Sequence, residues 1–194
     1  MAPIICCVDG IIGSGKTTAL QELESRGCVV FQEDVDEWLP YLNAFYVDKK
    51  RWSFTLQMEI LQSLTSQYKK IKRTSQPFVL IERCPKSCAI FARNSYNLGY
   101  MTDSEYALFS KYYNMLNPWT PDVTCVIDAS VDACLERVRQ RARLCEADID
   151  RQYLTNLNSE YARFHEPSII TIDGSATPTR VADQIIGIVN AFLV

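Results

Sequence analysis

The chain has little histidine and no closely paired cysteines. Its 194 residues contain a single histidine, His165, and eight cysteines, none of which forms a Cys-x-x-Cys pair. A structural zinc site needs closely spaced Cys or His ligands, so this pattern predicts none. At about 4% of the chain, the cysteines are also too sparse for a disulfide scaffold. We therefore expect free, buried thiols in a reducing compartment.

The chain also lacks an excess of positive charge and a long apolar run. The net charge of -3 and the pI near 5.3 argue against a nucleic-acid-binding protein. No segment of the sequence contains 18 consecutive apolar residues, so we expect no membrane-spanning helix. Residues 1–8 contain no Lys or Arg and predict a strand rather than a signal peptide. We expect a cytoplasmic protein, without membrane or nucleic-acid partners, that forms a single domain over residues 1–194.

Five short β-rich runs alternate with helical segments. The strands are expected at residues 4–8, 29–31, 78–81, 123–127 and 169–172. The helices are expected at residues 17–25, 52–72, 104–116, 131–143, 152–164 and 179–193. This alternation predicts an α/β fold, a five-stranded parallel sheet flanked by helices. Ligands of such a sheet bind at the carboxyl ends of its strands.

A glycine-rich segment follows the first strand. Residues 10–17 read Gly-Ile-Ile-Gly-Ser-Gly-Lys-Thr, which fits G-x-x-x-x-G-K-[ST]. Glycines let the backbone N–H groups turn inward around a phosphate, and the next helix adds its positive end. Lys16 is expected to reach the β- and γ-phosphates of ATP, and Thr17 to hold Mg²⁺. The segment predicts a P-loop NTPase-like fold.

A phosphate loop does not by itself identify the reaction. A switch GTPase, an ATPase and a small-molecule kinase all contain one. The Asn-Lys-x-Asp guanine-binding motif of GTPases is missing from this chain. A kinase needs in addition an acceptor site, a base and a cationic lid.

Charged residues follow the second and third strands. Glu33 comes first after the second strand, where a carboxylate can take the proton of an attacking alcohol. Glu82 and Arg83 follow the third strand, where two charges are costly unless they are used. Glu82 could bind Mg²⁺ or its water, and Arg83 could hold the attacking oxygen or pair with Glu33. A solvated acidic loop and a purely structural Glu82–Arg83 pair remain the alternatives.

Four arginines alternate near the end of the helix expected at 131–143. Arg137 and Arg141 share one face, and Arg139 and Arg143 share the neighbouring one. So many cations repel one another unless an anion lies among them, and a triphosphate is a natural candidate. The pattern predicts an Arg-rich lid over residues 139–150, with an ordinary solvated helix end as the alternative.

Together these motifs resemble the deoxynucleoside kinase family, the thymidine, deoxycytidine and deoxyguanosine kinases that contain no zinc. The phosphate loop, Glu-x-Val-x-x-Trp at 33–38, Glu-Arg at 82–83 and Arg-Ala-Arg-x-x-Glu at 141–146 occur in the family's order and spacing. The length is similar to that of the short thymidine kinases of large DNA viruses. Relatives are mostly homodimers, which implies the same state here.

The resemblance implies a role for each matching residue. Glu33 would deprotonate the nucleoside 5′-OH, Arg83 would bind that hydroxyl, and Glu82 would lie near Mg²⁺. Tyr46 and Glu146 would bind the sugar 3′-OH, which couples sugar binding to the lid. The remaining substrate-binding residues would be Gln57 at the base edge, Phe91 stacked on the base, and Trp38 in the pocket wall. The ATP-binding residues would be Gly10, Gly13, Ser14, Gly15, Lys16, Thr17, Thr18, Arg139, Arg141, Arg143 and Asp173.

The resemblance also indicates a substrate class. Ser87 is followed by Cys88, where the deoxycytidine kinases place an aspartate, so the chain looks like the pyrimidine-preferring, thymidine-accepting branch. We expect ATP- and Mg²⁺-dependent 5′-phosphorylation of thymidine first and deoxycytidine second, in nucleotide salvage. The alternatives are a thymidylate kinase, because Glu82-Arg83-x-x-x-Ser87 resembles its Asp-Arg-x-x-x-Ser segment, and a non-catalytic nucleotide-binding switch.

Overall fold

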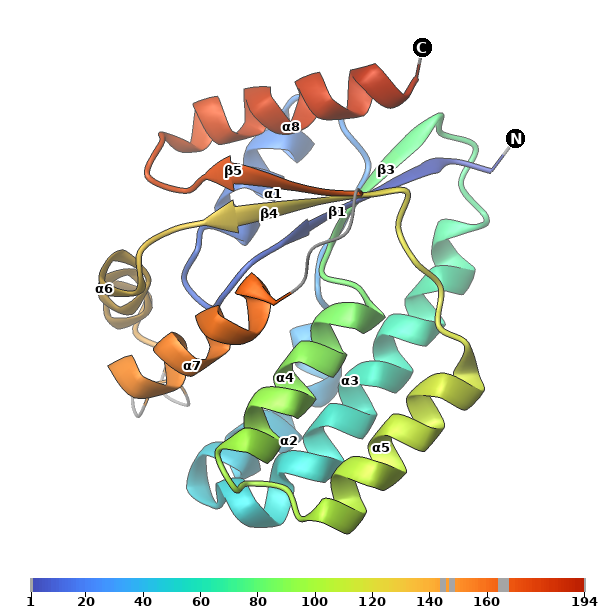
Figure 1. The fold of residues 1–194 in the computed structure, drawn as a ribbon. Helices are drawn as coiled ribbons and strands as arrows, with labels where there is room; N and C mark the ends of the chain where they lie inside the picture. Colours follow the sequence, from blue (N-terminus) through green and yellow to red (C-terminus); the bar gives the residue numbers. More distant parts are fainter. Residues whose placement is uncertain (1, 144–145, 147–148, 164–167, 194) are drawn as a thin grey trace.

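The sheet contains five strands, all parallel, in the order β2-β3-β1-β4-β5 (Figure 1). This computed structural model describes residues 2–143, 146, 149–163 and 168–193. The strands are β1 (Ile4–Asp9), β2 (Val30–Phe31), β3 (Phe78–Glu82), β4 (Val123–Asp128) and β5 (Ile169–Asp173). The expected five-stranded parallel sheet is therefore confirmed, and each expected strand coincides with an observed one to within one residue at either end.

Eight helices are described. They are α1 (Lys16–Ser25), α2 (Val35–Val47), α3 (Lys49–Ile71), α4 (Pro85–Asn97), α5 (Asp103–Leu116), α6 (Val131–Arg141), α7 (Arg151–Ala162) and α8 (Pro178–Phe192). Polar side chains at their N-caps explain several of the starts. Thr102, Ser130, Asp150 and Thr177 each accept a hydrogen bond from a backbone N–H in the first turn of α5, α6, α7 and α8.

Two helices were not expected from the sequence, and one is shorter than expected. Helix α2 contains Pro40 and begins in an acidic stretch, both of which obscure a helical pattern. Helix α4 starts at Pro85, where the proline occupies the first turn and lacks an N–H that the helix does not need. The helix expected to reach residue 143 ends at Arg141, because Ala142 adopts the left-handed conformation at φ 52°.

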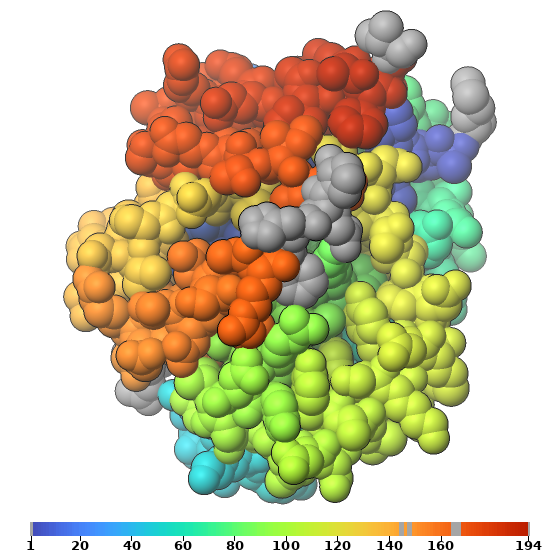
Figure 2. Space-filling model, viewed as in Figure 1, coloured from blue at the N-terminus to red at the C-terminus, as the bar shows by residue number. Residues whose placement is uncertain are grey.

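The two faces of the sheet are covered differently. Helices α1 and α8 pack on one face, and Leu20, Leu23 and Ile185 are fully buried there against β1 and β4. Helices α4, α6 and α7 lie on the other side, and α2, α3 and α5 extend from α4 away from the sheet (Figure 1). In the space-filling view α7 lies between α8 above and α4 below (Figure 2).

The described cysteines agree with the expectation of free thiols. Six are buried and Cys28 is half-buried, and all seven are free. Cys145 lies outside the described residues. Within the described ranges, no helix combines the length and the apolar character needed to cross a membrane.

Candidate active site

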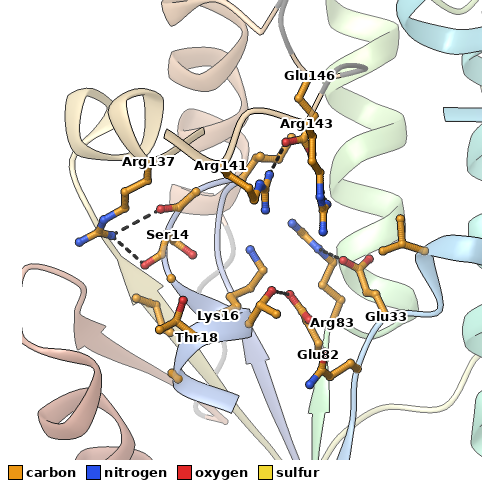
Figure 3. Close-up of a pocket in the computed structure, with 18 of the residues that line it drawn as sticks. Ser14, Lys16, Thr18, Glu33, Glu82, Arg83, Arg137, Arg141, Arg143 and Glu146 are labelled. Carbon is orange, nitrogen blue, oxygen red and sulfur yellow. Dashed lines mark hydrogen bonds and ion pairs between the residues drawn. The ribbon is translucent and has the colours of Figure 1, made fainter. Parts of the chain in front are cut away.

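A cavity of about 800 Å³ lies at the carboxyl ends of β1, β2 and β3. The phosphate loop, the residues after β2 and β3, and helices α2, α3, α4 and α6 all line it (Figure 3). Three charged residues that the sequence singled out from two separate segments, Glu33, Glu82 and Arg83, meet in its wall. The location fits the rule that open parallel sheets bind ligands at this edge.

The phosphate loop has the backbone that its glycines allow. Gly13 lies at φ +82°, and a Cβ there would come within 2.4 Å of the carbonyl oxygen of Cys134 on α6. The loop can therefore pack against α6 only because this residue has no side chain. Lys16 folds back into it, and its Nζ donates to the carbonyl oxygens of Gly10 at 3.1 Å and Ile11 at 2.9 Å.

Two features of the loop suit a polyphosphate. The buried hydroxyl of Ser14 has no hydrogen-bond partner among the described residues, although such groups are usually paired. Burial, followed by repulsion from Arg83, lowers the pKa of Lys16 to about 8. A bound phosphate would supply both an acceptor for the hydroxyl and a counter-charge for the ammonium group.

Thr17 and Glu82 form a pair of oxygen ligands. The Thr17 hydroxyl donates to Oε1 of Glu82 at 2.9 Å, and Glu82 is only 5% exposed. Both residues line the cavity next to Lys16. Oxygen atoms of a hydroxyl and a carboxylate are ligands that Mg²⁺ prefers, so these two residues fit the ion expected from the sequence.

Glu33 and Arg83 make an ion pair in the cavity wall. Nε of Arg83 lies 3.1 Å from Oε2 of Glu33, and Arg83 has the left-handed backbone angle φ 63°, which is unusual for a residue with a side chain. Partial burial raises the pKa of Glu33, although the charge of Arg83 opposes the rise. A carboxylate with a raised pKa is a stronger base, and that is what proton abstraction from an alcohol requires.

Two residues that the sequence did not indicate support Arg83 from behind. Its Nη1 donates to the Tyr161 hydroxyl at 3.0 Å, and that hydroxyl donates to Oδ1 of Asp9 at 2.7 Å. Asp9 also lies 3.6 Å from Nη1 of Arg83. Burial raises the pKa of Tyr161, so it stays protonated as a donor. Tyr161 lies on α7, 152 residues from Asp9, and carries no local signal that could have revealed the contact.

The far end of the cavity is largely apolar. Phe91 lies beneath the guanidinium of Arg83, whose Cζ is 4.6 Å from the ring centroid. Gln57 is 3% exposed and is the amide in this part of the wall. Its Oε1 accepts from the Cys88 thiol at 3.4 Å. The other side chains lining this end are Trp38, Leu42, Tyr46, Leu56, Ile60 and Leu64.

The arginines of the expected lid do not all reach the cavity. Arg141 and Arg143 line it, and both form ion pairs with Glu146, which is 6% exposed. Arg139 is exposed and is not among the lining residues, because it lies two residues from Arg137 and so faces away from the side of α6 that contacts the phosphate loop. Residues 144, 145, 147 and 148 of the expected lid lie outside the described residues.

Arg137 on α6 was not among the ATP-binding residues expected from the sequence, yet it contacts the phosphate loop directly. Its Nη1 donates to the carbonyl oxygens of Ser14 at 3.1 Å and Gly13 at 3.4 Å, and its Nη2 donates to that of Gly174 at 3.0 Å. It therefore ties the phosphate loop to α6 and to the loop after β5 (Figure 3). A guanidinium can make these contacts at once because its donors form a planar fork.

The remaining expected residues lie at or beside the cavity. Gly15 and Thr18 line it next to Thr17. Gly10 starts the loop and contributes a carbonyl to Lys16. Asp173 is exposed and is not among the lining residues, and its carboxylate accepts from the N–H of Ser175. The neighbouring residues of that loop that do line the cavity are Gly174 and Ala176.

Comparison with known proteins places the chain in a family. A model described as deoxynucleoside kinase matches residues 6–194. "Putative kinase protein 143R" of Invertebrate iridescent virus 6 is 32% identical over 97% of this chain and 98% of its own. The deoxyadenosine kinase of Dictyostelium discoideum is 32% identical over 81% of this chain and 64% of its own. The chain belongs to the deoxynucleoside kinase family, as the motifs indicated.

Solved structures confirm the fold. A deoxyadenosine kinase from M. mycoides, described with the products dCMP and a flexible dCDP bound, superimposes with a TM-score of 0.87 at 24% identity. The match covers 97% of this chain and 100% of that one. The same protein with bound dATP gives a TM-score of 0.85 at 23% identity. The P-loop NTPase-like architecture expected from the sequence is therefore confirmed.

The lowered pKa of Lys16 predicts a pH dependence of ATP binding. Below pH 8 Lys16 of the free protein is already protonated, whereas above pH 8 it must take up a proton when the triphosphate binds. We expect the affinity for ATP to fall up to about tenfold per pH unit above pH 8, with proton uptake on binding. Calorimetry in buffers of different ionisation enthalpy measures both quantities. The Lys16→Met variant should bind weakly with no such pH dependence, and an equally steep fall in that variant would contradict the assignment.

The contacts of Arg137 predict a difference between two arginines of one helix. Arg137→Ala removes three hydrogen bonds that hold the phosphate loop and the loop after β5. Because hydrogen bonds from a charged donor contribute about 1.5–3 kcal/mol each, ATP binding should weaken by about tenfold or more. Arg139→Ala, exposed on the same helix, is the matched control and should bind normally. Equal losses in the two variants, measured by fluorescence titration, would refute this division of roles.

Proposed function

We propose that residues 1–194 form one kinase domain that transfers the γ-phosphate of ATP to the 5′-OH of a deoxynucleoside. The observation that carries the proposal is the Glu33–Arg83 pair, joined at 3.1 Å, in the wall of the cavity that the phosphate loop enters. Glu33 as base and Arg83 as cation would act on the acceptor, and the residues of the phosphate loop would bind the phosphates of the donor. Membership of the deoxynucleoside kinase family supports the same reaction.

In the proposed reaction, Glu33 accepts the proton of the 5′-OH while the oxygen attacks the γ-phosphorus. The bond between the γ-phosphorus and the β–γ bridging oxygen breaks, and ADP leaves. Arg83 orients the attacking hydroxyl beside Glu33, and its buried contacts with Tyr161 hold the guanidinium in place. Lys16, Arg141 and Arg143 stabilise the charge on the transferred phosphoryl group.

Thr17 and Glu82 would hold Mg²⁺ in this proposal. The ion would neutralise charge on the β- and γ-phosphate oxygens. The oxygen-only ligand pair, already in contact at 2.9 Å, supports the assignment.

The acceptor is proposed to be a pyrimidine deoxynucleoside, thymidine first and deoxycytidine second. The buried Gln57 amide both donates and accepts, and its neighbours Leu56, Ile60 and Cys88 carry no charge. Tyr46 and Glu146 line the same cavity and would bind the sugar 3′-OH, while Phe91 would stack on the base. Glu146 is paired with two lid arginines, so sugar and triphosphate binding would be linked through it.

Relatives support a second candidate acceptor. The Dictyostelium discoideum relative is named for deoxyadenosine, and one from Bacillus subtilis, 30% identical, is named for deoxyadenosine and deoxycytidine. The human mitochondrial thymidine kinase 2 is 28% identical over 77% of this chain. Purine deoxynucleosides therefore belong in any substrate comparison.

An ATP-consumption assay over all natural deoxynucleosides, the ribonucleosides and thymidine monophosphate tests the proposal. We expect the highest kcat/KM for thymidine, then deoxycytidine, and no turnover of thymidine monophosphate, because its phosphate would meet the Glu33 carboxylate. Preferred turnover of thymidine monophosphate would make the protein a thymidylate kinase. Nucleotide binding without turnover of any acceptor would make it a non-catalytic switch.

Replacing the proposed base gives a sharper test. Glu33→Gln keeps the size of the side chain but removes the proton acceptor, so kcat should fall about 10²–10⁴-fold while ATP affinity stays near that of the wild type. The raised pKa of Glu33 also predicts that wild-type kcat/KM falls on acidification at a pH above the ordinary range of a glutamate. That acid limb should vanish in the variant. A loss of less than tenfold would mean that Glu33 is not the base.

We also propose a homodimer, formed through the outer face of α5, in a reducing compartment. Leu108, Tyr112, Met115 and Leu116 are 43%, 42%, 66% and 42% exposed, and their spacing places them on one face. The seven free thiols support the compartment.

The dimer surface predicts the effect of a charge. Leu108→Glu should convert the protein to a monomer in analytical ultracentrifugation, because a carboxylate would be buried without a partner. Asn114→Glu, which adds the same charge at an exposed position of the helix outside this face, is the control and should leave the assembly intact. A dimer that survives Leu108→Glu unchanged would place the interface elsewhere.

A further inference from the structure

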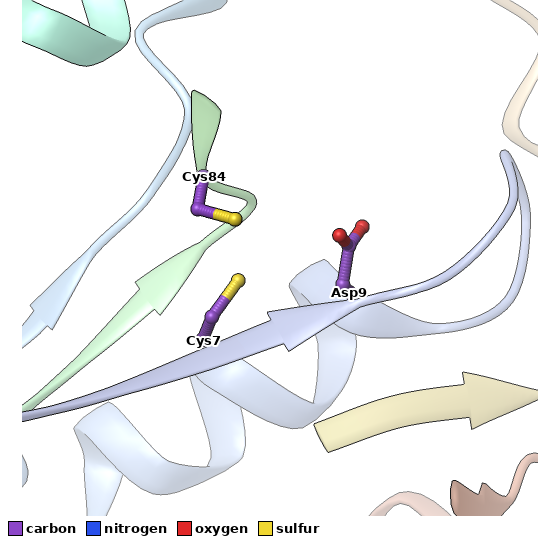
Figure 4. Close-up of side chains that lie close together, drawn as sticks. All are labelled: Cys7, Asp9 and Cys84. Carbon is purple, nitrogen blue, oxygen red and sulfur yellow. The ribbon is translucent and has the colours of Figure 1, made fainter. Parts of the chain in front are cut away.

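Behind Arg83, three ligand-type side chains from two distant segments of the chain meet in the protein interior. Cys7 lies in β1, Asp9 ends that strand, and Cys84 follows β3 (Figure 4). The two Sγ atoms and a carboxylate oxygen all lie within 4.8 Å of one another. The residues are 0%, 3% and 2% exposed. Among the described residues, no other group of three or more Cys, His, Asp or Glu side chains has this arrangement.

We propose that Cys7, Asp9 and Cys84 form a binding site for a thiophilic divalent cation of the Zn²⁺ class. Thiolate sulfur and carboxylate oxygen are both established zinc ligands, and sulfur excludes Mg²⁺ and Ca²⁺ as the preferred ions. Bonds of about 2.3 Å to sulfur and about 2.1 Å to oxygen would hold tetrahedral ligand atoms about 3.5–3.8 Å apart. The three side chains therefore need to close by only about 1 Å.

The charges of the site balance when the ion is bound. Two thiolates and one carboxylate carry three negative charges, and the ion supplies two positive ones. The ion's two charges offset the two new thiolates, and the Asp9 carboxylate keeps Nη1 of Arg83 at 3.6 Å, a cation that it shares with Glu33. When the ion M²⁺ binds, the two thiols become thiolate ligands and release two protons. A buried set of charges is tolerated only when it is neutralised in this way.

A fourth ligand and a route to the site are both available. The Ser87 hydroxyl donates to Oδ2 of Asp9 at 2.5 Å and to the Cys84 sulfur at 3.8 Å, so it, or a water in its place, can complete a tetrahedron. Asp9 and Cys84 also line a second cavity of about 680 Å³ together with Lys86, Asn158 and Tyr161. An ion can approach through this cavity without entering through the cavity that the phosphate loop lines.

Binding would affect the proposed reaction through Asp9. This residue accepts from Tyr161 at 2.7 Å and from Ser87 at 2.5 Å, and an ion competes for the same oxygen lone pairs. Cys84 is covalently next to Arg83, so drawing the sulfur toward an ion also displaces the guanidinium. This consequence, unlike the binding itself, rests on the proposed function, and occupancy is expected to inhibit phosphate transfer.

The first test measures binding to the reduced full-length protein without any substrate. Co²⁺ and Cd²⁺, added under argon after removal of the reductant, report thiolate ligation through a charge-transfer absorption band. We expect saturation at one ion per chain and release of about two protons per ion. X-ray absorption of the wild-type zinc complex should show two sulfur ligands together with oxygen, a readout that needs no variant.

Matched variants separate this site from other thiols. Cys84→Ser and Cys7→Ala should abolish the band, and Asp9→Asn should weaken binding by about tenfold or more. Cys6→Ser is the control, because Cys6 and Cys125 form another buried thiol pair, 3.7 Å apart, outside this ligand group. Cys28→Ser controls for a half-buried thiol. The proposal would be overturned if no charge-transfer band appeared, or if X-ray absorption showed only one sulfur ligand. A band that survives Cys84→Ser, or that depends on Cys6 or Cys28, would overturn it as well.

The second test concerns inhibition. Zn²⁺ should lower turnover in parallel with occupancy of the site, and a chelator should restore it. Binding without inhibition would overturn the coupling to Asp9 but not the site, whereas a protein that binds the ion and phosphorylates no nucleoside would refute the proposed function alone.

Discussion

The buried guanidinium of Arg83 is the charge on which the rest of the candidate site depends. It pairs with Glu33, contacts Tyr161, lies 3.6 Å from Asp9 and rests over the ring of Phe91. A buried cation is stable only when acids and hydrogen bonds surround it, and the buried acids equally need the cation. These partners come from the end of β1, the segment after β2, and helices α4 and α7. The acceptor wall is therefore one charged network rather than a set of independent side chains.

The same network connects the acceptor wall to the phosphate loop. Asp9 ends β1, and its Oδ1 accepts a hydrogen bond at 2.8 Å from the N–H of Gly10, the first residue of the loop. The charge of Arg83 contributes to the lowered pKa of Lys16. The proposed ion site is connected to the same network through Asp9, whose carboxylate would be shared between the ion, Tyr161 and Ser87. The proposed donor, acceptor and ion sites thus meet at the carboxyl end of one central strand, β1.

Much of the fold was accessible from the sequence because its signals are local. The apolar runs of β1, β3 and β4 and the spacing Gly-x-x-x-x-Gly-Lys-Thr are each read within a few residues. Helix α2 was missed because Pro40 and an acidic start mask its pattern, and α4 because it begins directly after the strand-end charges. The arginine pattern was read as two stripes, whereas Arg139 faces away from the cavity and Ala142 ends α6 before Arg143. In the lid, the left-handed backbone of Ala142 ends the helical spacing of the arginines before Arg143.

By itself the sequence determined the parallel sheet, the phosphate loop and the charged residues after β2 and β3, because hydrophobic periodicity and glycine spacing act over neighbouring residues. Only the tertiary structure decided which residues meet. Asp9 finds Ser87 and Tyr161, 78 and 152 residues away, and Arg137 reaches the phosphate loop from α6, 123 residues from Ser14. Cys84 joins Cys7 and Asp9 of β1 in the same way. Such contacts depend on strand order and on how the helices pack across the sheet, which no local pattern encodes.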